Sequence, residues 1–234
     1  GLRHQHVGDR AGGGGHRHVD RDARGTHLHP VHEAEVDDAH AGLGIDDGGE
    51  RIADHGAAVP DGYAGIDCAG HYLAPGLIDV HTHLDNTAAM KRALDSGTTT
   101  VRSASVPAFQ DVGLRELVRA GALPGPDVVA AGVYVTPDLE DGILADPRLA
   151  PLHRGVRTEA DLRLVVQVNA ERGVDVIKTR GTERAGRPDT DPREQVYTRE
   201  QLAIVVDEAA KHGLPVMVHA HGDEGARAAV EAGA

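Results

Sequence analysis

Apolar runs and amphipathic segments alternate from residue 77 to residue 234. The apolar runs predict buried strands, whereas the segments between them have helical spacing and are followed by glycine, which favours the end of a helix. We expect strands at 77–84, 98–104, 128–135, 174–179 and 214–220. We expect helices at 85–96, 114–120, 158–173, 198–212 and 223–232. The sequences TEAD (158–161) and TREQ (198–201) predict capping boxes at the starts of two of these helices. Strands that alternate with helices predict an α/β fold with a parallel sheet.

Two architectures fit this alternation, a TIM barrel and a doubly wound sheet. Polar side chains stand at the carboxyl ends of several expected strands, which is where barrel active sites lie. No glycine-rich nucleotide-binding fingerprint follows the first strand. We therefore expect a TIM-type (β/α)8 barrel, of which residues 76–234 supply the first five βα units.

The N-terminal part of the chain has a different character. Residues 1–45 are dominated by Gly, His, Arg and Asp and contain half of the sixteen histidines, without helical or strand periodicity. We interpret 1–45 as a poorly ordered His- and Gly-rich tail or as a misread part of the gene. Short strands separated by Gly and Pro are expected at 50–53, 63–68 and 70–73.

Composition excludes several classes of partner. A net charge of −13 argues against a nucleic-acid partner, and no helix carries the basic stripe of a membrane-surface protein. Cys68 is the single cysteine, so the chain has no internal disulfide, which fits a reducing compartment. No stretch is long and apolar enough to span a bilayer. We expect a cytoplasmic protein.

The strand at 77–84 carries the first candidate chemistry. Side chains alternate along a strand, so Asp79, His81 and His83 share one face. Buried polar groups need partners, and two imidazoles two residues apart converge on one point that a divalent metal fits. The His-x-His spacing recurs elsewhere in the chain, but only the pairs at 81/83 and 219/221 end an apolar run. These residues predict a metal site that includes His81 and His83.

Three segments together carry a resemblance to a known family. The sequences PGLIDVHTHL (75–84), TTVR (99–102) and LRELVRAGALPGP (114–126) are similar to the metal-dependent amidohydrolase superfamily, in the branch with imidazolonepropionase-like enzymes and prolidase-like dipeptidases. The resemblance extends from about residue 49 to the end. It implies that residues 46–75 form part of a small β-sandwich domain that precedes the barrel.

Lys178 is the second key position. On the strand at 174–179 it shares a face with Val174 and Val176, so it should point inward, where burial lowers the pKa of a lysine. The alternative is a lysine that snorkels to solvent at the strand end. The resemblance implies that the Lys178 amine becomes a carbamate that bridges two metals.

The resemblance also assigns the end of the fifth expected strand. It makes His219 the third histidine ligand, and we expect His221 to contact substrate or to orient the site. The family takes a further histidine from a sixth strand and an aspartate from an eighth, which would follow Ala234. On this basis we interpret the chain as a fragment of a protein that holds two Zn²⁺ ions when complete.

The function expected from these residues is the hydrolysis of a C–N bond in a small amide, dipeptide or cyclic amide, by a metal-activated water. We also expect a homo-oligomer. In the long loop 181–197, Arg184, Arg187 and Arg193 are candidates for pairing with a substrate carboxylate, or are merely solvated. The alternative function is a catalytically silent, amidohydrolase-like scaffold protein or an inactive fragment.

Overall fold

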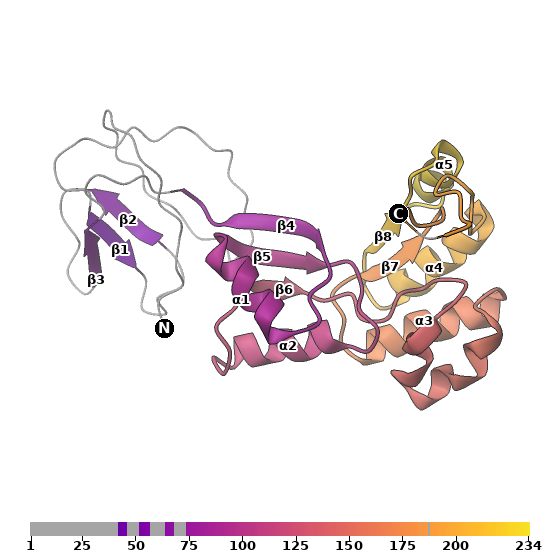
Figure 1. Ribbon diagram of the computed structural model, residues 1–234, viewed down its shortest axis with the longest axis horizontal. Coiled ribbons are helices and arrows are strands. Elements are labelled where there is room, and N and C mark those ends of the chain that lie inside the picture. Colours follow the sequence, from indigo (N-terminus) through magenta and orange to yellow (C-terminus); the bar gives the residue numbers. More distant parts are fainter. Residues whose placement is uncertain (1–41, 46–51, 57–63, 68–73, 187) are drawn as a thin grey trace. The chain divides into compact units, whose positions relative to one another are not determined.

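A computed structural model describes residues 42–45, 52–56, 64–67, 74–186 and 188–234 (Figure 1). Contacts within the chain divide it into two units, one of residues 1–77 with 94–97 and one of residues 78–93 with 98–234. The expected tail lies outside the described residues up to residue 41, and so does the strand expected at 70–73.

The first unit contains a three-stranded antiparallel sheet. Strands β1 (Gly42–Ile45), β2 (Ile52–Gly56) and β3 (Ala64–Asp67) pair in the order β2-β1-β3. Strand β1 lies inside the segment that the sequence assigned to the tail. Two of the four residues of β1 are glycines, so the strand carries almost no alternating pattern. The β-sandwich itself stays a prediction.

The second unit has the predicted α/β order. Parallel strands alternate with helices along the chain, and the expected elements are all present with shifted ends (Figure 1). The strands are β4 (Leu77–Thr82), β5 (Thr98–Ser103), β6 (Asp127–Val129), β7 (Ile177–Arg180) and β8 (Val216–His219). The helices are α1 (Thr87–Asp95), α2 (Gln110–Arg119), α3 (Glu159–Glu171), α4 (Arg199–Lys211) and α5 (Asp223–Glu231). Two short 3-10 helices that the sequence did not predict, η1 (Glu140–Leu144) and η2 (Pro147–Arg154), follow β6.

Helices α3 and α4 begin where their sequences predict. The Thr158 side chain accepts from the N–H of Asp161, and the Asp161 side chain accepts from the N–H of Thr158. Thr198 and Gln201 form the same reciprocal pair at the start of α4. Both capping boxes are therefore confirmed. The two helices pack together, and their buried faces form one core with β7.

Strand β6 ends six residues earlier than the sequence predicts. The carboxylate of Asp111, which is fully buried in the first turn of α2, accepts hydrogen bonds from the N–H groups of Ala131 and Gly132. The amide oxygen of the buried Asn169 accepts from the N–H of Val133. These side chains take the donors that a neighbouring strand would otherwise pair, and Gly132 adopts a positive φ of 64°. The chain therefore stops pairing as a strand after β6.

The chain nevertheless returns to the sheet at Val135. The N–H of Val135 donates to the carbonyl of Lys178 at 2.9 Å, and Val135 forms a parallel bridge with Thr179 of β7. The strands of the second unit therefore keep their chain order within two sheets, first β4-β5-β6 and then β7-β8. This order is the one that a barrel requires, and the closed barrel stays a prediction. Among the described residues, no helix has the length and apolar character needed to cross a bilayer.

We predict that Asp111→Ala lowers the free energy of unfolding by about 2–4 kcal/mol, because two buried N–H groups lose their acceptor. Urea denaturation followed by circular dichroism measures the change. Glu224→Ala is the matched control, since Glu224 is an exposed acidic residue in the first turn of α5. Equal stability of the two variants would contradict this account of the strand end.

Candidate functional site

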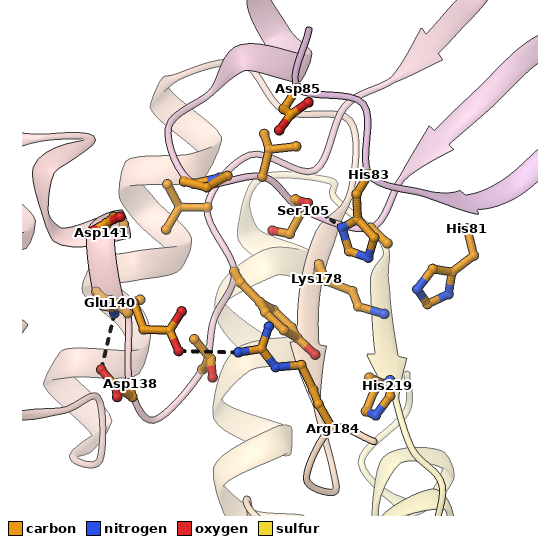
Figure 2. A pocket seen from close by; sticks show the side chains of 18 of the residues that line it. His81, His83, Asp85, Ser105, Asp138, Glu140, Asp141, Lys178, Arg184 and His219 are labelled. Carbon is orange, nitrogen blue, oxygen red and sulfur yellow. Dashed lines mark hydrogen bonds and ion pairs between the residues drawn. The ribbon is translucent and has the colours of Figure 1, made fainter. Parts of the chain in front are cut away.

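A cavity of about 430 Å³ lies at the carboxyl ends of several parallel strands in the second unit (Figure 2). Eleven ionisable side chains line it: His81, His83, Asp85, Tyr134, Asp138, Glu140, Asp141, Lys178, Arg184, His219 and His221. The five residues that the sequence singled out for the site, which come from β4, β7 and the end of β8, are therefore brought to one pocket. Cavities at this end of parallel strands are where ligands bind in α/β proteins.

His81 and His83 reach the pocket from the end of β4. The Nδ1 of His83 lies 2.7 Å from the carbonyl oxygen of Ser105. A carbonyl only accepts, so Nδ1 carries the proton, and Nε2 of His83 keeps a free lone pair. The pKa of His81 is lowered by desolvation and by the charge of Lys178, which favours the neutral form that binds metals. Asp79 does not line the pocket, and its carboxylate accepts from the backbone N–H of His81 at 3.0 Å.

Lys178 lies within the buried strand β7. The residue is 2% exposed, which contradicts the alternative of a lysine that snorkels to solvent. Its Nζ has no hydrogen-bond partner within the described part of the chain and lies 5.9 Å from the centroid of the Tyr134 ring. Burial, with the nearby charge of Arg102, lowers the pKa of Lys178 to about 8. A sizeable fraction of this amine is therefore neutral and nucleophilic near physiological pH.

His219 ends β8, His221 follows two residues later, and both line the pocket. The Nε2–H of His219 donates to the carbonyl of Glu183 at 3.1 Å, which leaves Nδ1 free as a ligand atom. Burial lowers the pKa of His219, although the hydrogen bond to Glu183 opposes this shift. The rings of His219 and His221 meet edge to face with their centroids 4.6 Å apart. The Thr182 hydroxyl accepts from the backbone N–H of His221 and fixes its position.

The four histidines form two separate pairs. The ring centroids of His81 and His83 are 5.7 Å apart, and across the described residues no three His, Cys, Asp or Glu side chains lie close enough to hold a metal ion. The residues nevertheless fit zinc in kind, because imidazole nitrogens are ligands that zinc prefers and a buried amine without a partner lies in the same pocket. Two of the imidazoles, those of His83 and His219, also have their second nitrogen held by a backbone carbonyl.

The sequence analysis missed Ser105, which orients His83. Ser105 is 5% exposed and has a φ of 89°, a strained value for a residue with a side chain. Its hydroxyl donates to the carbonyl of Gly132 at 2.6 Å, which holds the residue in that conformation. No periodicity or motif marks a serine for this role, so only the fold identifies it.

Of the two candidate arginines that the structure describes, one reaches the pocket. Arg184 lines the cavity, where its Nη2 lies 3.5 Å from Oε1 of Glu140. Arg193 is exposed and pairs with Asp191, outside the lining. Arg187 lies outside the described residues. Arg193 is therefore a solvated side chain, whereas Arg184 remains a candidate for pairing with a substrate carboxylate.

Comparisons with known proteins match most of the second unit. The model of the amidohydrolase family matches residues 72–234. The ochratoxinase of Aspergillus niger is 24% identical over 202 residues, which cover 69% of this chain and 42% of that protein. Its crystal structure matches with a TM-score of 0.55 at 24% identity, covering 68% of this chain and 45% of that chain. A crystal structure of a Xaa-Pro dipeptidase with bound methionine has a TM-score of 0.60 at 23% identity, covering 83% of this chain and 59% of that chain.

These likenesses to solved structures show a common fold. This chain spans about half the length of the relatives that it matches or less.

We predict that Lys178 titrates with a midpoint near pH 8 in metal-free protein kept in CO₂-depleted buffer, because burial disfavours the ammonium form. Trace acetylation with acetic anhydride at increasing pH, followed by peptide mass mapping, measures the neutral fraction of each lysine. Its labelling should rise through pH 8 and then level off. Lys211, whose pKa is raised by its hydrogen bond to Glu208, is the internal control and should level off above pH 10. Coincident profiles would contradict the environment described for Lys178.

Proposed function

Since this chain belongs to the amidohydrolase family, we propose that its pocket hydrolyses the C–N bond of a small amide or dipeptide with the help of divalent metal. The likeness to a dipeptidase and to an ochratoxinase supports the amide class of substrate. The rest of the proposal depends on the side chains in the pocket.

The observation that carries the proposal is the buried, unpartnered amine of Lys178. An amine without a hydrogen-bond partner destabilises a folded protein, and replacing it by an apolar residue would relieve that cost. The amine lies in the same pocket as two histidine pairs, where it could help to hold a metal ion once it is carboxylated. A catalytically silent scaffold would gain nothing from it, and the enzyme is the better-supported function.

The Lys178 amine is suited to react with carbon dioxide. In the neutral form, its nitrogen bonds to the carbon of CO₂, one C=O π bond breaks, and a proton leaves to water. The product is an N-carboxylate, which carries two oxygen donors where the free amine had none. Burial of Nζ favours this reaction, because it lowers the pKa of Lys178 to about 8 and so raises the uncharged fraction of the amine near neutral pH.

The residues that would hold the metal, for which we propose two Zn²⁺ ions, are His81, His83, His219 and the carboxylated Lys178. When bound, zinc activates a water molecule and polarises the scissile carbonyl. The backbone carbonyls of Ser105 and Glu183 hold His83 and His219 in the tautomers that such a site needs. His221, fixed by Thr182, is placed to contact the substrate or to orient the site.

Tyr134 contributes to the polarity of the pocket. Burial raises its pKa to about 12, so the phenol keeps its proton at physiological pH and can donate a hydrogen bond. A closed eight-stranded barrel, a homo-oligomeric assembly and a cytoplasmic location also belong to the proposal and rest on the sequence.

We predict that Lys178→Ala lowers kcat/KM for N-acyl amino acids and dipeptides by about 100-fold or more in protein assayed with Zn²⁺ and bicarbonate, because a side chain that would hold the metal is lost. A short carboxylic acid added with bicarbonate should restore part of the activity. Lys91→Ala, which changes an exposed lysine of α1 outside the pocket, should leave kcat/KM unchanged. Full activity of Lys178→Ala would show that the carbamate has no part in the reaction.

We predict that His81→Ala and His83→Ala each weaken zinc binding by about 10-fold or more, because each removes a ligand. Isothermal titration with Zn²⁺ measures the change without any need for catalysis. His212→Ala, at the exposed end of α4, is the control. Every variant keeps residues 1–45, so binding by their histidines cancels in the comparison. Identical zinc affinities in all three variants would rule out a metal site at β4.

A further inference from the structure

Arg184 and Glu140 face each other across one side of the pocket (Figure 2). Arg184 belongs to the loop after β7, and Glu140 begins η1. The pair is separated by 3.5 Å, and the two side chains are 36% and 50% exposed. An ion pair this long and this exposed contributes little to stability, so a second carboxylate can replace Glu140 at low cost.

The guanidinium of Arg184 has unused hydrogen-bond donors on the edge that Nε and Nη2 form. Its Nε is buried and has no hydrogen-bond partner among the described residues, while Nη2 makes only the long contact with Glu140. These two N–H groups point in the same direction and match the two oxygens of one carboxylate. A carboxylate that accepts from both would satisfy the buried donor, which Glu140 leaves unpaired.

Glu140 is a poorly adapted permanent partner for this arginine. Its φ of 48° lies in the left-handed region, which a glutamate adopts only at a cost. The side chain is exposed on the pocket rim, next to the exposed Asp141 and Asp138. These neighbouring acids repel an anion of high charge density, and they favour a single carboxylate over a phosphate.

Tyr134 connects Arg184 to the reacting end of the pocket. The positive charge of Arg184 acts on the Tyr134 phenol, and the ring centroid of Tyr134 lies 5.9 Å from Nζ of Lys178. Arg184, Tyr134 and Lys178 line the same cavity, so a carboxylate held by Arg184 would share the pocket with the amine. A substrate that carries a carboxylate close to its amide, as in an N-acyl amino acid or a dipeptide, would place both groups in this one pocket.

We propose that Arg184 binds the free carboxylate of the substrate and that Glu140 occupies this place in the ligand-free protein. The substrate class is then an amide of an amino acid with a free carboxyl group. This specificity deepens the proposed hydrolysis and rests on it, whereas the binding of the carboxylate can be measured without hydrolysis.

The test compares the binding of N-acetylglycine and N-acetylglycinamide, which differ only in the carboxylate. NMR titration of the full chain, followed on the arginine Nε–H signals, gives both affinities. We expect the acid to bind at least about 10-fold more tightly than the amide, and Arg184→Gln to remove that difference. Arg184→Lys, which keeps the charge but loses the two-donor edge, should lose most of it. Arg193→Gln is the control from the same loop.

The second arm examines Glu140. Glu140→Gln and Asp141→Asn each remove one negative charge from the rim, but only the first frees Arg184. We expect Glu140→Gln to strengthen binding of N-acetylglycine more than Asp141→Asn does, with no such difference for the amide. Equal binding of acid and amide by the unchanged chain would overturn the carboxylate site. Equal effects of Glu140→Gln and Asp141→Asn would overturn the role of Glu140.

These outcomes are independent of the catalytic proposal. A chain that binds the acid through Arg184 but hydrolyses no amide would refute the proposed hydrolysis and leave the carboxylate site standing. A chain that hydrolyses dipeptide amides as fast as free dipeptides would refute the carboxylate site and leave the hydrolysis standing.

Discussion

Hydrogen bonds to one glycine, Gly132, connect the core of the second unit to its pocket. The buried carboxylate of Asp111 accepts from the N–H of Gly132, and the carbonyl of Gly132 accepts from the hydroxyl of Ser105. The carbonyl of Ser105 then holds Nδ1 of His83. A side chain at this glycine would clash, because a Cβ built there lies 2.5 Å from Oδ1 of Asn169. The orientation of a pocket histidine therefore depends on a backbone position that admits no side chain.

The same departure from the sheet creates the wall of the cavity. Because Asp111 and Asn169 satisfy the backbone beyond β6, the segment that follows is free to bend away and return at Val135. Val133, Tyr134 and Thr136 of this segment line the pocket. The stability of the fold and the shape of the site are thus served by the same buried polar groups.

The charged side chains of the pocket differ in burial according to the element that carries them. Lys178 is held inside the sheet, whereas Asp138, Glu140 and Asp141 stand on the rim formed by the residues around η1. Burial makes the lysine a weak cation, and exposure leaves the rim acids in contact with water. Arg184 stands between the two, in contact with the rim and acting on Tyr134. This arrangement gives the two ends of a substrate different environments, which is the basis for orienting it.

The sequence by itself determined the order of strands and helices, both capping boxes, and the face on which His81, His83 and Lys178 lie. These features depend on local periodicity and on contacts within a few residues. It could not determine where β6 ends, why Ser105 is strained, or which of Arg184 and Arg193 reaches the pocket. Each of these was decided by partners 20 to 44 positions away in the chain: Asp111 for Ala131, Asn169 for Val133, Gly132 for Ser105, and Glu140 for Arg184. Contacts of this kind leave no periodic signal in the sequence, because a single buried hydrogen bond or ion pair constrains only the two residues that make it.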